Sequence, residues 1–249
     1  MLQSKGTWCV GVLMAAIGAG SAAAIQDAPS AKEVLTRSAE ALKNSKLVKY
    51  EATFEATGWA KRFAPEITGM AVVGQRSKWD LDEFYCEVKM KKGESEEVLE
   101  YKAGCDGDTY YLLDAKTKKV HVDMDVAVMG SQNQDIMRVV LGEFAQAEPF
   151  KDFLAVEGAE VVGSETVDGH ECFQVKDPSG RGQPVWSISK KDYLPRRIKR
   201  SYPPREDSNG EGATTQLTLT HLTVDPKLER NYFRPQVPEG FTKTDEFAP

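Results

Sequence analysis

Residue types that do chemistry in proteins are few in this chain of 249 residues, and they stand far apart. The three histidines, His121, His170 and His221, have no neighbour at the spacing of metal ligands. His170 and Glu171 would lie on opposite faces of a strand, and they lack the second histidine of a zinc-binding H-E-x-x-H helix. The G-x-S-x-G nucleophile elbow, the Walker loop and the dinucleotide fingerprint are also missing. The histidines are therefore typical of ordinary strand and turn positions.

Several carboxylates stand close together in the sequence. The segments Asp106–Asp108 and His121–Asp125 could touch a cation, but neither reaches the ligand count of a calcium loop. Asp80 and Asp82 are a further pair of carboxylates, the residue type that glycoside hydrolysis uses. In an acidic chain such pairs usually serve solvation, and a turn and an exposed strand face explain the two segments better. We therefore predict a protein that is not an enzyme and that needs no metal ion and no cofactor.

Residues 1–24 have the features of a secretory signal peptide. Lys5 supplies the positive charge, residues 8–19 are apolar, and Ser21–Ala24 supplies the small residues that signal peptidase accepts. A membrane span needs about 20 apolar residues, so an uncleaved anchor is the weaker alternative. Cys9 lies at the start of the apolar run, which is not the setting of a lipoprotein cysteine. We predict cleavage after Ala24 and a soluble periplasmic protein without an acyl anchor.

Residues 25–249 show no internal repeat and no low-complexity linker, so we predict a single β-rich domain. The chain has a formal net charge of −6, which becomes −7 when Lys5 leaves with the signal peptide. This acidity argues against nucleic acid as a partner, because phosphate neutralisation needs clustered cations. Lys190–Arg200 does hold six basic residues, and their alternation with apolar ones indicates a solvated strand face. Contact with an anionic head group or an acidic partner is the alternative.

Two segments show the periodicity of amphipathic helices. Ser30–Glu33 has the form of a capping box, in which the Ser30 hydroxyl accepts a hydrogen bond from the Glu33 amide. Apolar and small residues between Val34 and Leu42 then fall on one stripe, and Asn44 fits a helix end. The second segment, Ile136–Phe144, also carries an apolar stripe and follows a polar capping region. We expect this second helix to plug a curved sheet.

Most of the remaining chain has the period of strands. Val48–Thr57 alternates apolar and polar residues, which indicates a half-buried antiparallel strand. Asp168-Gly169 between two β-rich runs indicates a type I′ hairpin turn, since both central residues need a positive φ. In Thr214–Val224 the apolar residues change face, which a bulge near Thr220 or His221 explains. The sequence therefore predicts an antiparallel sheet with short turns.

An exported chain with three cysteines beyond the signal peptide can hold one disulfide and one thiol. The first two cysteines lie on two alternating strands that flank a polar turn. If that turn is centred between Ser95 and Glu96, Cys86 lies opposite Cys105 on the same face. This register predicts a Cys86–Cys105 disulfide that stabilises the fold by about 3 kcal/mol. The third cysteine, Cys172, would stay buried and reduced.

Three segments resemble the periplasmic lipoprotein-carrier superfamily, which includes LolA-like and RseB-like proteins. The first lies within residues 161–200 and reads VDGHECFQV, then W-x-I-x-K-K-x-Y-L-P-R-R-I. The second is the hairpin CDGDTYYLLDAKTKKVHV, residues 105–122. The third is a closing segment in which the pair Tyr232-Phe233 is followed by Pro238-Glu239-Gly240-Phe241. These motifs are turns and strand ends, so they point to a fold more than to a ligand.

The resemblance implies an α+β fold in which a strongly curved antiparallel sheet, a half-open β-barrel, encloses or is capped by a few amphipathic helices. It implies an exported carrier that shields an apolar or acylated ligand, a lipid or a lipoprotein, in the chamber of that barrel. The alternative is a regulatory or scaffold module of the RseB type, with a filled core, that acts through protein contacts in the envelope. We expect a monomer that contacts membranes only peripherally and whose closing tail lies against the sheet edge.

Inward-facing side chains of the expected strands would line the chamber opposite the second helix. A closed core would leave only small voids, whereas a carrier needs a cavity of several hundred cubic ångström. The predicted lining residues are Tyr50, Phe54, Phe84, Val88, Tyr101, Ile136, Val140, Phe144, Trp186 and Ile188.

Overall fold

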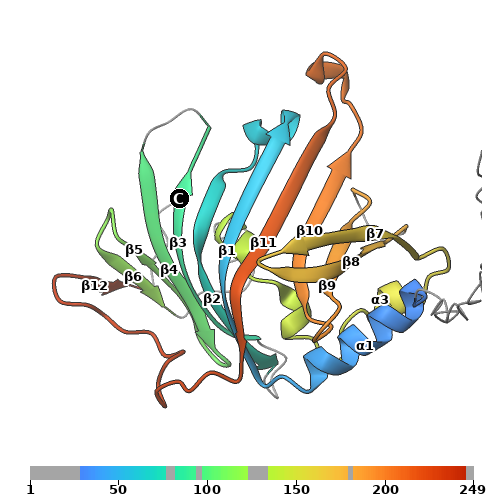
Figure 1. Ribbon diagram of the computed structural model, residues 1–249. Helices are drawn as coiled ribbons and strands as arrows, with labels where there is room; N and C mark the ends of the chain where they lie inside the picture. Colours follow the sequence, from blue (N-terminus) through green and yellow to red (C-terminus); the bar gives the residue numbers. More distant parts are fainter. Residues whose placement is uncertain (1–28, 77–81, 94–96, 123–133, 179–181, 245–249) are drawn as a thin grey trace, which may run out of the picture.

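A computed structural model describes residues 29–76, 82–93, 97–122, 134–178 and 182–244 of the chain (Figure 1). The predicted signal peptide, Asp80 and the carboxylates of Asp123 and Asp125 lie outside these residues. No helix in the described part is long and apolar enough to cross a membrane.

Twelve strands within the described residues form one sheet, in the order β12-β6-β5-β4-β3-β2-β1-β11-β10-β9-β8-β7. Neighbouring strands are antiparallel, except that β12 runs parallel to β6. The strands are β1 (Leu47–Gly58), β2 (Glu66–Arg76), β3 (Asp82–Lys91), β4 (Val98–Asp106), β5 (Tyr110–Asp114), β6 (Lys119–Val122), β7 (Glu160–Val167), β8 (His170–Lys176), β9 (Val185–Ser189), β10 (Pro195–Tyr202), β11 (Ala213–Val224) and β12 (Thr242–Thr244).

The sheet is curved and does not close, with β12 and β6 at one end and β7 at the other (Figure 1). Few helices accompany it, so the molecule has the predicted half-open barrel shape. We call the face that carries Tyr50 and packs against the 3-10 turns after residue 134 the inner face, and the opposite face the outer face. The helices and 3-10 turns are α1 (Ala31–Lys43), η1 (Trp59–Arg62), η2 (Ile136–Val139), η3 (Gly142–Phe144), α3 (Lys151–Leu154) and η4 (Glu206–Ser208).

Helix α1 forms as the sequence predicts. The Ser30 hydroxyl accepts a hydrogen bond from the Glu33 amide at 3.2 Å, and Asn44 is the C-cap. The buried stripe of the helix, from Val34 to Leu42, packs in the main core and contacts η3 and α3. Local capping and an apolar stripe are therefore enough to place this helix.

Strand β1 alternates as predicted, with Tyr50, Ala52 and Phe54 buried on the inner face. The predicted bulge is present, because Lys49 pairs with Thr223 but Glu51 pairs with Thr220. His221 lies in this bulge with a φ of 51°.

The turn Asp168-Gly169 has φ values of 50° and 74°, which confirms the type I′ hairpin between β7 and β8. The Asp168 carboxylate accepts a hydrogen bond from the backbone amide of His221 at 2.8 Å. A turn and a bulge that lie 53 residues apart in the chain are thereby joined.

The prediction that the second segment forms an α-helix is wrong. Residues 136–144, which we call the plug, make the two 3-10 turns η2 and η3, and Val140 and Leu141 between them are extended. Two β-branched valines and Gly142 disfavour an α-helix here. The Tyr50 hydroxyl also binds the Val139 carbonyl and the Leu141 amide, and it fixes the extended link. The plug nevertheless packs on β1 and β2 at the inner face, where the sequence places it.

The predicted disulfide is wrong because the β3–β4 register differs by two residues. Cys86 pairs with Ala103, while Cys105 pairs with Phe84. Among the described residues, Cys86, Cys105 and Cys172 are all thiols. A shift of two residues keeps every side chain on its predicted face, so the apolar pattern cannot distinguish the two registers.

The closing tail lies against the sheet edge as predicted. Strand β12 pairs with β6, and the Thr242 amide donates a hydrogen bond to the Lys118 carbonyl at 3.0 Å. On the outer face, Phe241 packs against a second, smaller core formed by Tyr111, Leu113, Val120 and Val122.

Candidate functional site

The structure brings the predicted chamber residues together, as a packed core. Most of them are buried in the main hydrophobic cluster, and Tyr101 and Val140 lie half-buried at its margin. The buried ones are Tyr50, Phe54, Phe84, Val88, Ile136, Phe144, Trp186 and Ile188, each at most 6% exposed.

Contacts between the plug and the sheet fill the space between them. The rings of Tyr50 and Phe144 lie 5.6 Å apart, and the Arg138 guanidinium lies 5.2 Å above the Phe54 ring. Burial raises the pKa of Tyr50, which stays neutral and donates to the plug. These contacts are those of a protein interior.

A hollow remains beside the plug, which we call the inner pocket. It encloses about 560 Å³ between α3 and β9. Phe150 and Trp186 meet edge to face there, with ring centroids 5.1 Å apart. Burial raises the pKa of Glu143 at its rim, against a smaller opposing effect from Arg200. The other lining residues are Gln146, Ala147, Glu148, Lys151, Asp152, Phe153 and Asp177.

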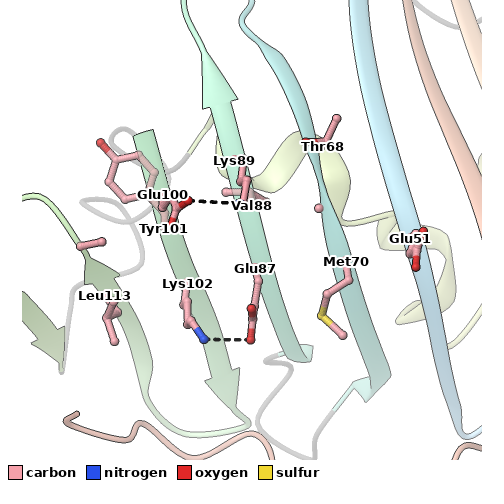
Figure 2. Close-up of a pocket in the computed structure, with 12 residues that line it drawn as sticks. Glu51, Thr68, Met70, Glu87, Val88, Lys89, Glu100, Tyr101, Lys102 and Leu113 are labelled. Atoms are coloured by element: carbon pink, nitrogen blue, oxygen red, sulfur yellow. Dashed lines mark hydrogen bonds and ion pairs between the residues drawn. The ribbon is translucent and has the colours of Figure 1, made fainter. Parts of the chain in front are cut away.

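A groove of about 350 Å³ crosses the outer face of β1 to β5, and we call it the outer groove. Strand alternation positions its residues, because every second side chain points outward. Figure 2 shows Met70, Glu87 and Lys102 projecting from neighbouring strands along it. Its lining is mostly apolar and consists of Glu51, Thr68, Gly69, Met70, Glu87, Val88, Lys89, Glu100, Tyr101, Lys102, Leu113 and Ala115.

Ion pairs cross the outer groove between β3 and β4. Lys102 and Glu87 are 3.0 Å apart, and Lys89 and Glu100 are 3.2 Å apart (Figure 2). The register that sets Cys86 opposite Cys105 would also set Lys91 opposite Glu100, whereas the observed register, shifted by two residues, sets Lys89 there. All four side chains are about half exposed, so each pair contributes at most about 1 kcal/mol.

The closing tail crosses the outer face beside this groove and encloses a second hollow of about 510 Å³, the tail pocket. Tyr232 of the tail packs edge to face on Tyr85 of β3, with centroids 5.2 Å apart. The Tyr111 side chain lies close to Gly104, which has no side chain. A Cβ at Gly104 would lie 2.5 Å from the Tyr111 hydroxyl and would block this position. The lining is Lys49, Tyr85, Glu87, Lys102, Tyr111, Leu113, Lys227, Leu228, Glu229, Tyr232, Arg234, Gln236 and Pro238.

The carboxylate of Glu87 in the tail pocket has two hydrogen-bond donors. It accepts hydrogen bonds from the Tyr85 hydroxyl at 2.5 Å and from Lys102 at 3.0 Å. Partial burial opposes ionisation, but these two hydrogen bonds and the positive charges of Lys102 and Lys49 together outweigh it and hold the pKa of Glu87 below its ordinary value. Glu87 is therefore an anion whose charge Lys102 already balances.

Cations outnumber anions in the rest of the tail pocket. Lys49, Lys227 and Arg234 line it, and within the described part of the chain they make no ion pair. Glu229 is the remaining carboxylate of the lining. This local excess of positive charge contrasts with the net charge of −6 of the whole chain.

The described residues hold no group of three or more His, Cys, Asp or Glu side chains that could bind a metal ion. His121 is buried in β6, and His221 binds Glu51 through Nδ1 at 3.0 Å. The predicted residues pack on the inner face, and only Val88 and Tyr101 among them also border the outer groove, so sequence reasoning missed that groove and the tail pocket as sites. The available signal was the run of Lys and Glu on outward positions of β3 and β4, which reads equally well as a solvated face.

No family model matches the chain, and no curated protein matches it. Among solved structures, LprF from Mycobacterium bovis is 13% identical over 85% of this chain and 97% of its own, with a TM-score of 0.46. The Mycobacterium tuberculosis lipoprotein LppX is 12% identical over 84% of this chain and 98% of its own, with a TM-score of 0.41.

A third similar structure is MucB in complex with MucA(peri), which is 14% identical with a TM-score of 0.40. It matches 83% of this chain, but this chain covers only 60% of MucB. These structures have the LolA-like fold. With identities below 15% and TM-scores below 0.5, the likeness carries no argument about what this chain binds.

Proposed function

We propose that this protein is an exported, non-enzymatic binding module of the cell envelope that acts through its surfaces. The observation that supports this proposal is the packing of the inner face, where the expected chamber is occupied by the plug and the sheet's own aromatic rings. Export is inferred from residues 1–24 of the sequence. This is the regulatory or scaffold interpretation of the fold, with a filled core.

Carriage of an acyl chain among the predicted lining residues would require space that their packing does not provide, because the inner pocket beside the plug reaches Trp186 alone among them. A chain gains about 0.8 kcal/mol for each methylene that it buries, but only where it displaces no equally good packing. Entry would need removal of the plug, which would expose Ile136 and Phe144, each now at most 3% exposed. Exposing these two side chains would cost about as much free energy as the burial of several methylenes would gain.

An uncharged fluorescent acyl ester tests this proposal. The unmodified protein should show no saturable binding at micromolar concentrations. Phe144→Ala, which opens a void in the core, serves as the positive control and should bind the ester weakly. Saturable binding by the unmodified protein that Phe144→Asp abolishes, with the fold intact by circular dichroism, would contradict the proposal.

Acyl carriage with a displaced plug is the second candidate, and the inner pocket favours it. Phe150, Phe153 and Trp186 already line a hollow next to the plug, and a chain could begin to enter there. Trp186 is the natural reporter, because it lines the inner pocket and packs on Phe150 there. With Trp59 and Trp79 replaced by Phe, a saturable change in Trp186 emission on adding the ester would support carriage, and a constant emission would exclude it.

A further inference from the structure

We propose that the outer groove and the tail pocket form one binding site for an anionic amphiphile. The anionic head would lie in the tail pocket and the hydrocarbon chain would extend along the outer groove. This inference goes beyond the proposed function, because it adds a small-molecule ligand on the face opposite to the expected chamber. It does not depend on whether the inner face opens.

The two hollows are neighbours on the outer face. Glu87, Lys102 and Leu113 line both of them. Leu113 is 7% exposed and presents an apolar surface at the junction. A ligand with two chemically different ends can therefore contact both hollows at once.

The charge of the tail pocket selects an anion. Glu87 pairs with Lys102 and accepts a hydrogen bond from Tyr85, and among the other cations of the pocket it interacts with Lys49 alone. Lys49, Lys227 and Arg234 then face a single further carboxylate, Glu229, among the lining residues. A phosphate or carboxylate head would meet an excess of positive charge.

The tail holds these groups in place. Strand β12 fixes one end of the tail to β6, and Tyr232 packs on Tyr85 near its middle. The Asp225 carboxylate fixes the other end, because it accepts hydrogen bonds from the amides of Lys46 and Leu47 at 2.9 and 3.0 Å. Lys227 and Arg234 therefore project from a segment attached at both ends, which lowers the entropy cost of binding.

The outer groove supplies the apolar part of the site. Met70 extends along it from β2, as Figure 2 shows, and the backbone of Gly69 lies in its floor. Methionine adapts its flexible side chain to ligands of irregular shape. Each further methylene that the groove covers should strengthen binding by about two- to fourfold.

Monomeric lysolipids with one short acyl chain test the proposal directly. Lysophosphatidylglycerol should bind the full mature protein at least about tenfold more tightly than lysophosphatidylcholine of the same chain length. Glycerol 3-phosphate, the head without a chain, should bind weakest. Binding is measured by isothermal titration calorimetry below the concentration at which the lysolipids form micelles.

Substitutions separate the two parts of the site. The double variant Lys227→Gln, Arg234→Gln should weaken lysophosphatidylglycerol binding by about tenfold and leave lysophosphatidylcholine nearly unchanged. Met70→Asp should weaken both by at least about tenfold, since it places a carboxylate in the chain's path. Lys61→Gln is the matched control, because Lys61 pairs with Glu66 outside both hollows and also carries one exposed positive charge.

Several outcomes would overturn the proposal. Equal affinity for the two lysolipids would show that the site does not select an anionic head. Tight binding of glycerol 3-phosphate would show that the site binds anions without an acyl chain. Efficient displacement of the lysolipid by an aspartate-rich peptide would reassign the surface to a protein partner. Phe144→Asp changes the inner face alone, so loss of lysolipid binding in that variant, with the fold intact by circular dichroism, would place the ligand in the core and contradict both proposals.

Discussion

The Tyr50 hydroxyl joins the sheet to the plug through two hydrogen bonds, to the Val139 carbonyl at 3.0 Å and from the Leu141 amide at 2.9 Å. Val139 and Leu141 are buried, so water cannot replace these bonds. One side-chain oxygen thus satisfies two backbone groups that a helix would otherwise pair. The form of the plug depends on this oxygen.

Removal of the Tyr50 hydroxyl tests that role. Tyr50→Phe should lower the free energy of unfolding by about 2–3 kcal/mol, because it leaves a buried donor and a buried acceptor unpaired. Tyr85→Phe is the control, since its hydroxyl binds the half-exposed Glu87 and should cost less than about 1 kcal/mol. Urea denaturation measures both, and equal costs would show that the plug does not depend on Tyr50.

Arg196 is a buried cation, 2% exposed, in the bulge of β10. Its Nη2 lies 2.5 Å from the Asp192 carboxylate, while its Nε has no hydrogen-bond partner in the described structure. Partial burial opposes ionisation of Asp192, but the Leu194 amide, Arg196 and Ser189 outweigh it and hold the pKa of Asp192 below its ordinary value. The pair therefore depends on an ionised Asp192.

A depressed pKa in the folded state means that the unfolded state binds the proton more readily. The stabilisation by Asp192 is therefore present above its unfolded pKa of about 3.9 and is lost as the pH falls through the folded value. Asp192→Ala should cost about 1–3 kcal/mol at neutral pH, and its deficit should shrink below about pH 4. Denaturation of both proteins between neutral and acidic pH measures this, and a constant difference would contradict it.

The three cysteines should behave as buried thiols. Burial raises the pKa of Cys86 to about 12 and that of Cys172 to about 11, so the reactive thiolate is scarce at neutral pH. Alkylation of the non-reduced mature protein should modify three cysteines in denaturant and almost none in the native state, as counted by mass spectrometry. A mass that shows only one modified cysteine in denaturant would indicate a disulfide between the other two and contradict this prediction.

At the scale of elements, the sequence predicts those features that local residues determine. Ser30 with Glu33 specifies the start of α1, Asp168-Gly169 specifies a turn, and the apolar switch in β11 specifies a bulge. In each case the residue types restrict φ and ψ or satisfy a backbone group within a few positions. Such signals need no knowledge of the rest of the fold.

Elements that depend on distant partners could not be predicted in the same way. Residues 136–144 have a helical pattern, but their conformation follows from Tyr50, which is about ninety residues away in the chain. The β3–β4 register differs from the prediction by two residues because both registers bury the same side chains. The outer groove escaped prediction because it needs strands β1 to β5 to be placed together, and the tail pocket because it also needs the tail beside them.

At the scale of the whole molecule, the tail gives the outer face a second core. Phe241 and Tyr85 pack against the cluster of Tyr111, Leu113, Val120 and Val122, which lies on the side opposite to the plug. Strands β5 and β6 are thereby covered on both faces. The sheet end that carries β12 depends on the tail for its apolar cover.

Loss of this cover should weaken one end of the sheet more than the rest. Phe241→Ala should cost about 1–2 kcal/mol, since the half-exposed ring is not fully buried. Hydrogen exchange should accelerate in β5 and β6 while β8 to β10 remain protected. Uniform acceleration across the sheet would show that the tail stabilises the whole molecule instead.

The pairing of β1 with β11 has a consequence for how the chain is made. Val48 of β1 pairs with Val224 of β11. The middle of the sheet is therefore complete only after nearly the whole chain has been made. Until then β1 has β2 on one side and an open edge on the other. Such distant pairing slows folding, because a long loop must close first. The two halves of the sheet, β1 to β6 and β7 to β11, can therefore join only after β11 has been made.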